Sequence, residues 1–137
     1  MGNRAVITTK EKKIGVYLHW NGGRDSVEAF LTYCKLKGYR TPDKDDYGWA
    51  RLCQVIGNWF GGECSIGIDV YDRLDKDNGD NGVYIIENWE IVDRLYFEGT
   101  EQQNYSLYDF LIDINNKQPE SEKLNEALLK EFESEVV

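Results

Sequence analysis

The most constraining feature of the sequence is an abrupt change of apolar periodicity within YLHWNGGRDSVEAF, residues 17–30. Before the break, residues 14–19 alternate between apolar and other side chains, which predicts a strand with one buried face. After Asn-Gly-Gly at 21–23, apolar residues recur at the spacing of a single helix face. These residues are Val27, Phe30, Leu31 and Cys34. The chain must therefore pass directly from a strand into a helix, capped by Asp25 or Ser26 and ended by Gly38.

The same two periodicities assign the remaining elements. Further strands are expected at 3–9, 64–70, 83–86 and 89–97, and helices at 46–60, around 105–112 and after Pro119. The stripe of the last helix is Leu124, Leu128 and Phe132. Strands and helices are grouped rather than alternating, in the order β-β-α-α-β-β-β-α-α. The expected fold class is α+β, an antiparallel sheet of about five strands with helices packed on one face.

Charge divides the chain unevenly. The net charge is −9 over 137 residues, but residues 1–40 carry eight basic and three acidic side chains, and residues 100–137 carry three basic and nine acidic ones. We expect a core domain at 1–100 and an acidic helical extension at 101–137, packed on the core or on another subunit. The N-terminal part could face an anion and the tail a basic partner. Direct binding to nucleic acid is disfavoured, because that affinity depends on neutralising phosphates.

The three cysteines, Cys34, Cys53 and Cys64, are odd in number and widely spaced. They fit neither a disulfide framework nor a paired-cysteine metal site. Free thiols on apolar faces behave as small hydrophobes and are typical of a reducing cytoplasm. No signal peptide and no membrane-spanning apolar run is present in the sequence. We therefore expect a cytoplasmic protein without membrane contact.

The strand-to-helix junction is the candidate ligand site. A helix that starts at glycines presents unpaired backbone N–H groups and the positive end of its dipole, which together attract anions. Arg24 could add a forked donor, Trp20 could stack on a base and Asn21 could bind the edge of that base. The spacing is neither a Walker A loop nor Gly-x-Gly-x-x-Gly. The alternative is a structural turn in which Asp25 caps the helix. The candidate residues are His19, Trp20, Asn21, Gly22, Gly23, Arg24 and Asp25.

Catalytic and metal sites receive less support from the sequence. His19 is the single histidine, and as a general base it would need a carboxylate such as Asp25 or Asp69. The acidic loop at 72–82 fails as an EF-hand, because Gly79 falls on a ligand position and Asn88 on the position of the bidentate Glu. An irregular Ca²⁺ or Mg²⁺ site is less favoured there than a solvated connection rich in turn-forming residues. We expect no catalytic residues, no metal and no cofactor.

Four stretches carry a resemblance to known proteins: MGNRAVITT, GVYLHWNGGRDSVEAFL, YGWARLCQVIGNWFGG and DNGDNGVYIIENWEIVDR. Together they resemble a group of small proteins encoded by bacterial phages and prophages, over about residues 1–97. The resemblance implies the cytoplasm of an infected bacterium as the setting and a role against host defence. It implies no catalytic residues.

Three functions follow in order of preference. The first is a binder that sequesters a small anionic, nucleotide-like signal molecule. The second is an acidic inhibitor of a host defence nuclease, of the anti-CRISPR or anti-restriction type, acting through the loop at 72–82 and the tail. The third is a nucleotide hydrolase that uses His19. A homo-oligomer would favour the first, because such pockets are often built between subunits.

Overall fold

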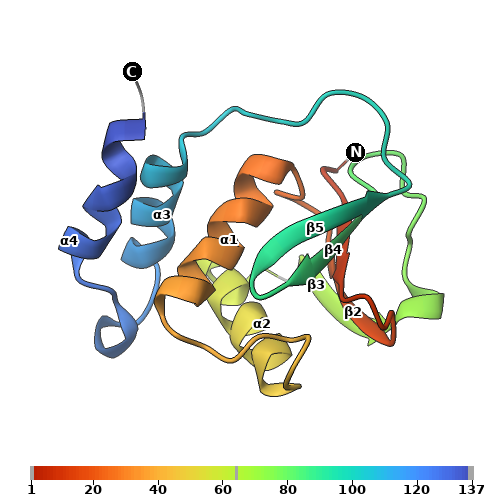
Figure 1. Cartoon of the computed structure of the whole chain (residues 1–137), viewed down its shortest axis with the longest axis horizontal. Coiled ribbons are helices and arrows are strands. Elements are labelled where there is room, and N and C mark those ends of the chain that lie inside the picture. Colours follow the sequence, from red (N-terminus) through yellow and green to blue (C-terminus); the bar gives the residue numbers. More distant parts are fainter. Residues whose placement is uncertain (1, 64, 136–137) are drawn as a thin grey trace.

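A five-stranded sheet with helices on one face forms the core of the protein (Figure 1). The structure, a computed structural model, describes residues 2–63 and 65–135. The strands are β1 (Ala5–Thr8), β2 (Ile14–Leu18), β3 (Ile66–Val70), β4 (Val83–Glu87) and β5 (Glu90–Leu95). The α+β class and the number of strands are as predicted from the sequence.

The sheet is mixed rather than antiparallel. Its strand order is β3-β2-β1-β4-β5, and β1 pairs in parallel with β4, whereas the other three pairs are antiparallel. The prediction of an antiparallel sheet was therefore wrong at this pair. Strand β3 already runs parallel to β1. After β3, the chain crosses to the far side of β1 and returns to the end of the sheet at which β3 began, so β4 also runs parallel to β1. The crossing segment packs on the sheet face opposite the helices, in a small cluster formed by Val6, Tyr17, Tyr71, Leu74, Val83, Ile85 and Leu95.

The helices are α1 (Arg24–Leu36), α2 (Tyr47–Phe60), α3 (Leu107–Asn116) and α4 (Glu126–Leu129). The first three lie close to their predicted positions, but the prediction of a last helix opened by Pro119 was wrong. Pro119 precedes a single 3₁₀ turn, and α4 begins only after Asn125, whose side chain accepts a hydrogen bond from the Ala127 N–H. The later start turns Leu129 into the core and leaves Leu128 exposed. None of the helices in the described ranges combines the length and the hydrophobicity needed to cross a membrane.

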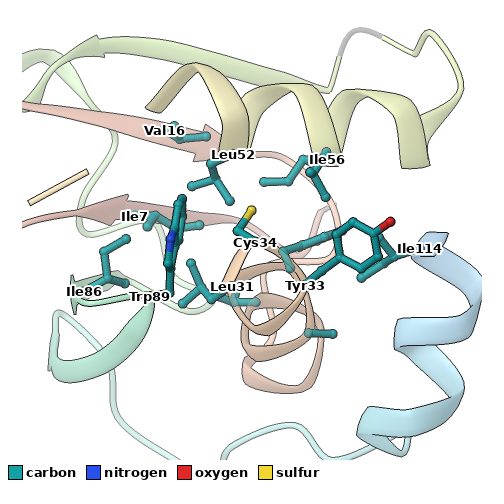
Figure 2. Packing of buried hydrophobic residues seen from close by; sticks show 14 of the residues in the cluster. Ile7, Val16, Leu31, Tyr33, Cys34, Leu52, Ile56, Ile86, Trp89 and Ile114 are labelled. Atoms are coloured by element: carbon teal, nitrogen blue, oxygen red, sulfur yellow. The ribbon is translucent and has the colours of Figure 1, made fainter. Parts of the chain in front are cut away.

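Helix α1 lies at the centre of the hydrophobic core (Figure 2). Its predicted stripe is confirmed, since Val27, Phe30, Leu31 and Cys34 are all essentially inaccessible to solvent. Burial raises the pKa of the Cys34 thiol, so this group stays protonated and packs as a hydrophobe. Cys53 is partly buried and free, and Cys64 lies outside the described residues.

Asn and Asp side chains hold the connection between β3 and β4 in place by hydrogen bonds. The buried Asn78 amide oxygen accepts hydrogen bonds from the Asp80 and Gly82 N–H groups at 3.1 and 3.0 Å. The Asn81 amide donates to the Arg4 carbonyl at 3.0 Å. Asp80 accepts from both the backbone N–H and the guanidinium Nε of Arg4, at 3.0 and 2.8 Å. These bonds close the loop on the start of β1.

Replacing Asp80 tests this closure. The hydrogen bond from the Arg4 guanidinium holds the pKa of the Asp80 carboxyl below its usual value. A lowered pKa means that the stabilisation is present at neutral pH and is lost as the pH falls through the folded-state pKa. We expect Asp80→Asn to reduce the free energy of unfolding by about 1 kcal/mol at neutral pH, and this difference from the wild type should disappear as the pH falls through the folded-state pKa of Asp80. Urea unfolding over a series of acidic pH values measures this, and Asp77→Asn, at an exposed carboxylate of the same loop, should show no such difference.

Candidate functional site

The N-cap of α1 is Gly23, and no side chain caps the helix, so the prediction of a cap by Asp25 or Ser26 was wrong. The first turn of α1 nevertheless holds a carboxylate of the chain. One oxygen of the buried Asp25 side chain accepts from the Ser26 N–H at 2.7 Å, and the other accepts from the Asn104 N–H at 2.8 Å. Asp25 therefore takes the place that the sequence assigned to a ligand anion. The bond to Asn104 also ties the helix start to the segment that follows β5.

The two glycines of the junction serve close packing. A β-carbon on Gly22 would lie 2.5 Å from the Asn3 carbonyl oxygen and 2.7 Å from the Ala5 β-carbon. The Gly22 N–H donates to that same carbonyl at 2.8 Å, and the Gly22 carbonyl accepts from the buried Tyr84 hydroxyl at 2.6 Å. Gly23 lies directly beneath the Gln102 side chain. Neither glycine leaves room for a side chain of its own.

Arg24 is engaged by two carboxylates, Glu28 at 2.6 Å and Glu101 at 3.2 Å. Glu101 also forms an ion pair with Arg94, whose guanidinium lies between the rings of Tyr84 and Phe97, about 4 Å from each centroid. Arg24 lines a groove of about 470 Å³ between α1 and β5. The charged groups of this groove are already paired with one another, Arg24 with Glu28 and Lys35 with Glu90.

His19 faces Tyr17 rather than a carboxylate. Its Nδ1 lies 3.0 Å from the Tyr17 hydroxyl, and its ring packs edge-on against Trp20 with centroids 5.1 Å apart. Burial raises the pKa of the Tyr17 hydroxyl, so that group stays protonated at neutral pH. The Asp25 carboxylate that could have partnered His19 is taken up by Ser26 and Asn104.

Trp20 and Asn21 open onto a different feature, a shallow hollow of about 510 Å³. We call it the aromatic hollow. The structure brings together here residues from three segments far apart in the sequence. The lining residues are Trp20, Asn21, Trp59, Phe60, Glu63 and Lys117. Trp20 is 44% exposed, an unusually open position for a tryptophan.

Trp59 is the rigid part of the aromatic hollow. Its indole N–H donates to Asp113 at 2.8 Å, and its ring stacks on Phe110 with centroids 5.3 Å apart. Phe30 and Phe60 contact the same ring edge-on at 5.7 and 4.9 Å. These contacts fix the ring plane before any ligand arrives, which lowers the entropy cost of binding.

Lys117 supplies the positive charge of the hollow. Its ammonium lies 5.4 Å from the centroid of the Trp59 ring. Within the part of the chain that the structure describes, no carboxylate comes within ion-pair distance of it. Asn21 and Glu63 add an amide and a carboxylate to the lining. The hollow therefore offers an aromatic surface, one available cation and hydrogen-bonding groups of both kinds.

Sequence reasoning placed Trp20 and Asn21 in a ligand site but missed Trp59, Phe60 and Lys117. Trp59 is half-buried near the end of the helix predicted at 46–60. Lys117 lies in the acidic tail, where nothing in the sequence relates it to Trp20. One signal was present: Trp59 and Phe60 stand at the last two positions of α2, directly before the glycine that ends the helix.

A further hollow of about 520 Å³ is acidic, with Asp77, Asp80 and Glu98 beside Tyr96 and Phe97. It suits a cation better than an anion. No group of three or more His, Cys, Asp or Glu side chains in residues 2–63 and 65–135 is arranged to hold a metal ion. None of the protein families, curated proteins or solved structures compared with the chain matches it.

Proposed function

We propose that this protein binds and sequesters a small, planar, anionic ligand of the nucleotide type in the aromatic hollow. The observation that carries the proposal is that Trp20, Trp59 and Phe60 line one hollow together with Lys117. The Lys117 ammonium lies 5.4 Å from the Trp59 ring centroid and has no acidic partner among the described residues. Every kind of nucleobase can stack on such rings, and a phosphate group can pair with the free Lys117 ammonium.

The mixed polarity of the lining favours a nucleotide over a simple aromatic acid. Glu63 can accept hydrogen bonds from ribose hydroxyls or an exocyclic amino group, and Asn21 can both donate and accept. The same Glu63 carboxylate repels additional negative charge, so a ligand with few phosphates fits best. Two stacking contacts and one charge contact correspond to a dissociation constant on the order of 0.1 mM.

The proposed function needs no catalytic group. His19 contacts Tyr17 and Trp20 and, in the part of the chain that the structure describes, is not paired with a carboxylate. The resemblance to phage-encoded proteins supports a biological setting in which the ligand is a nucleotide signal of a bacterial defence system. Sequestration of such a signal requires the binder at a concentration above its dissociation constant.

Removing Trp20 tests the proposal. We expect Trp20→Ala to weaken binding of AMP or a cyclic dinucleotide about 10-fold or more, because a stacked base loses about 1–3 kcal/mol with its ring. Lys117→Gln should weaken AMP binding but leave adenosine unaffected, since adenosine has no phosphate. Isothermal titration calorimetry measures both effects, and the fluorescence of Trp20 and Trp59 gives an independent signal.

Tyr47→Ala is the matched control, because Tyr47 is as exposed as Trp20. It lies at the first residue of α2, whereas the aromatic hollow is at the last two residues of that helix. This variant should leave binding unchanged. Ribose 5-phosphate and sulfate control for simple anion binding. The proposal fails if no nucleotide, cyclic dinucleotide or ADP-ribose binds at millimolar concentration, or if Trp20→Ala binds AMP as well as the wild type does.

A further inference from the structure

Strand β3 forms one edge of the sheet, and its apolar side chains are poorly covered. Ile66, Ile68 and Val70 stand opposite Leu18, Val16 and Ile14 of β2, so they lie on the helix-covered face. Ile68 is nevertheless 55% exposed and Val70 45% exposed. An edge strand with exposed β-branched residues is a template for pairing with another strand.

The backbone groups of β3 alternate between the two sides of the strand. The Tyr71 N–H donates to the Lys13 carbonyl, and the His19 N–H donates to the Ser65 carbonyl. In an antiparallel pair, this pattern directs the backbone of residues 65, 67, 69 and 71 towards β2. The N–H and C=O groups of Ile66, Ile68 and Val70 therefore point away from the sheet, where no strand of the described chain pairs with them.

The opposite edge of the sheet is protected. Strand β5 carries Glu90, Asp93 and Arg94 along its six residues, and its pairing with β4 is interrupted by a register shift. Charged side chains and such irregularities are the usual means by which proteins block pairing at an edge. On β3, the single charged residue is Asp69, whose carboxylate accepts from its own neighbour, the Val70 N–H.

We infer that β3 of one chain pairs antiparallel with β3 of a second copy, around a two-fold axis at Ile68. In this register Ile68 faces itself and Ile66 faces Val70, so all three outward-directed residues form backbone hydrogen bonds in both copies. The Val70 N–H exchanges the exposed Asp69 carboxylate for the Ile66 carbonyl of the other copy. The exposed apolar side chains meet on one face of a sheet that runs through both subunits.

The sequence of β3 is self-complementary, and this selects a second copy as the partner. Its apolar residues are spaced symmetrically about Ile68. The register that centres on Ile68 also sets Asp69, the single charged residue of β3, opposite Gly67 of the other copy, so no like charges face each other. A register shifted by one residue would instead set apolar side chains on opposite faces of the continuous sheet.

The mass of the full chain in solution tests the inference. Sedimentation equilibrium at submillimolar protein should give twice the 15.9 kDa mass of the chain. Ile68→Lys should give a folded monomer, because this side chain is more than half exposed and its replacement leaves the core intact. Val92→Lys is the matched control, an apolar residue 48% exposed on the other edge strand, and it should remain dimeric.

Amide hydrogen exchange gives a second readout that does not depend on a variant. The Ile66 and Ile68 N–H groups should exchange slowly at high protein concentration and rapidly on dilution. Gly67→Asp should weaken the dimer several-fold, because it sets a second carboxylate opposite Asp69 of the other copy, whereas Gly67→Lys should not. A monomeric wild type, a dimeric Ile68→Lys variant or equally stable dimers of Gly67→Asp and Gly67→Lys would overturn the inference. Trp20→Ala should dimerise normally, so failure of the ligand proposal is recognised separately.

Discussion

Gly22→Ala is expected to lower the free energy of unfolding by about 3 kcal/mol, a large effect for the addition of one methyl group. The new β-carbon would approach the Asn3 carbonyl oxygen and the Ala5 β-carbon to 2.5 and 2.7 Å, so the backbone before β1 would have to move. That movement also disturbs the hydrogen bond from the buried Tyr84 hydroxyl to the Gly22 carbonyl. Urea unfolding monitored by circular dichroism measures the loss.

The adjacent glycine is the matched control. A β-carbon on Gly23 meets the Gln102 side chain, which can rotate away and lose its 3.0 Å hydrogen bond from Asn3. We expect Gly23→Ala to cost about 1 kcal/mol, the usual net value of such a bond. Equal losses for the two variants would show that close backbone packing at Gly22 is not what the junction requires.

Phe30→Ala is expected to cost about 3–5 kcal/mol, a large part of the stability of a domain of this size. Phe30 is inaccessible to solvent, and its ring packs edge-on against Trp59 and Phe110, with centroids 5.7 and 5.6 Å away. Its removal leaves a cavity where α1 meets the end of α2 and α3. The cavity should lower the denaturation midpoint without changing the dependence on urea concentration.

Phe30→Leu fills most of that space and should cost less than about 1.5 kcal/mol. Because Trp59 rests on Phe30, the alanine variant should also shift tryptophan fluorescence and weaken ligand binding in the aromatic hollow. A loss below about 1.5 kcal/mol for Phe30→Ala would mean that α1, α2 and α3 can collapse around the missing ring.

The sequence predicted local structure better than the contacts between distant segments. The stripe from Val27 to Cys34 was predicted because helical periodicity is a property of neighbouring residues, and burial confirms it. The parallel pairing of β1 with β4 depends instead on the side from which the loop at 72–82 crosses the sheet, and periodicity carries no information on this. The start of α4 was predicted wrongly for a local reason. Asn125 caps the helix with its side chain, and this signal outweighs the preference of Pro119 for a first helical position.

The candidate site divides in the same way. The strand-to-helix passage was predicted, but the role of its polar residues depends on a segment about 80 positions away, which brings Glu101, Gln102 and Asn104 to the helix start. The placement of Trp20 and Lys117 at the same hollow depends on how α3 packs on α1 and α2. Tertiary packing of this kind determines which polar residues remain available to a ligand.

The central position of β1 has a consequence for synthesis of the chain. Its pairing partner β4 is separated from it by about 75 residues, which a ribosome adds in about 4–15 s. During that interval the β1–β2 hairpin leaves the ribosome with one long edge open and with Val6 and Ile7 uncovered. The sheet therefore cannot be completed in the order in which the chain is synthesised, and β1 keeps an unpaired edge until β4 has been made.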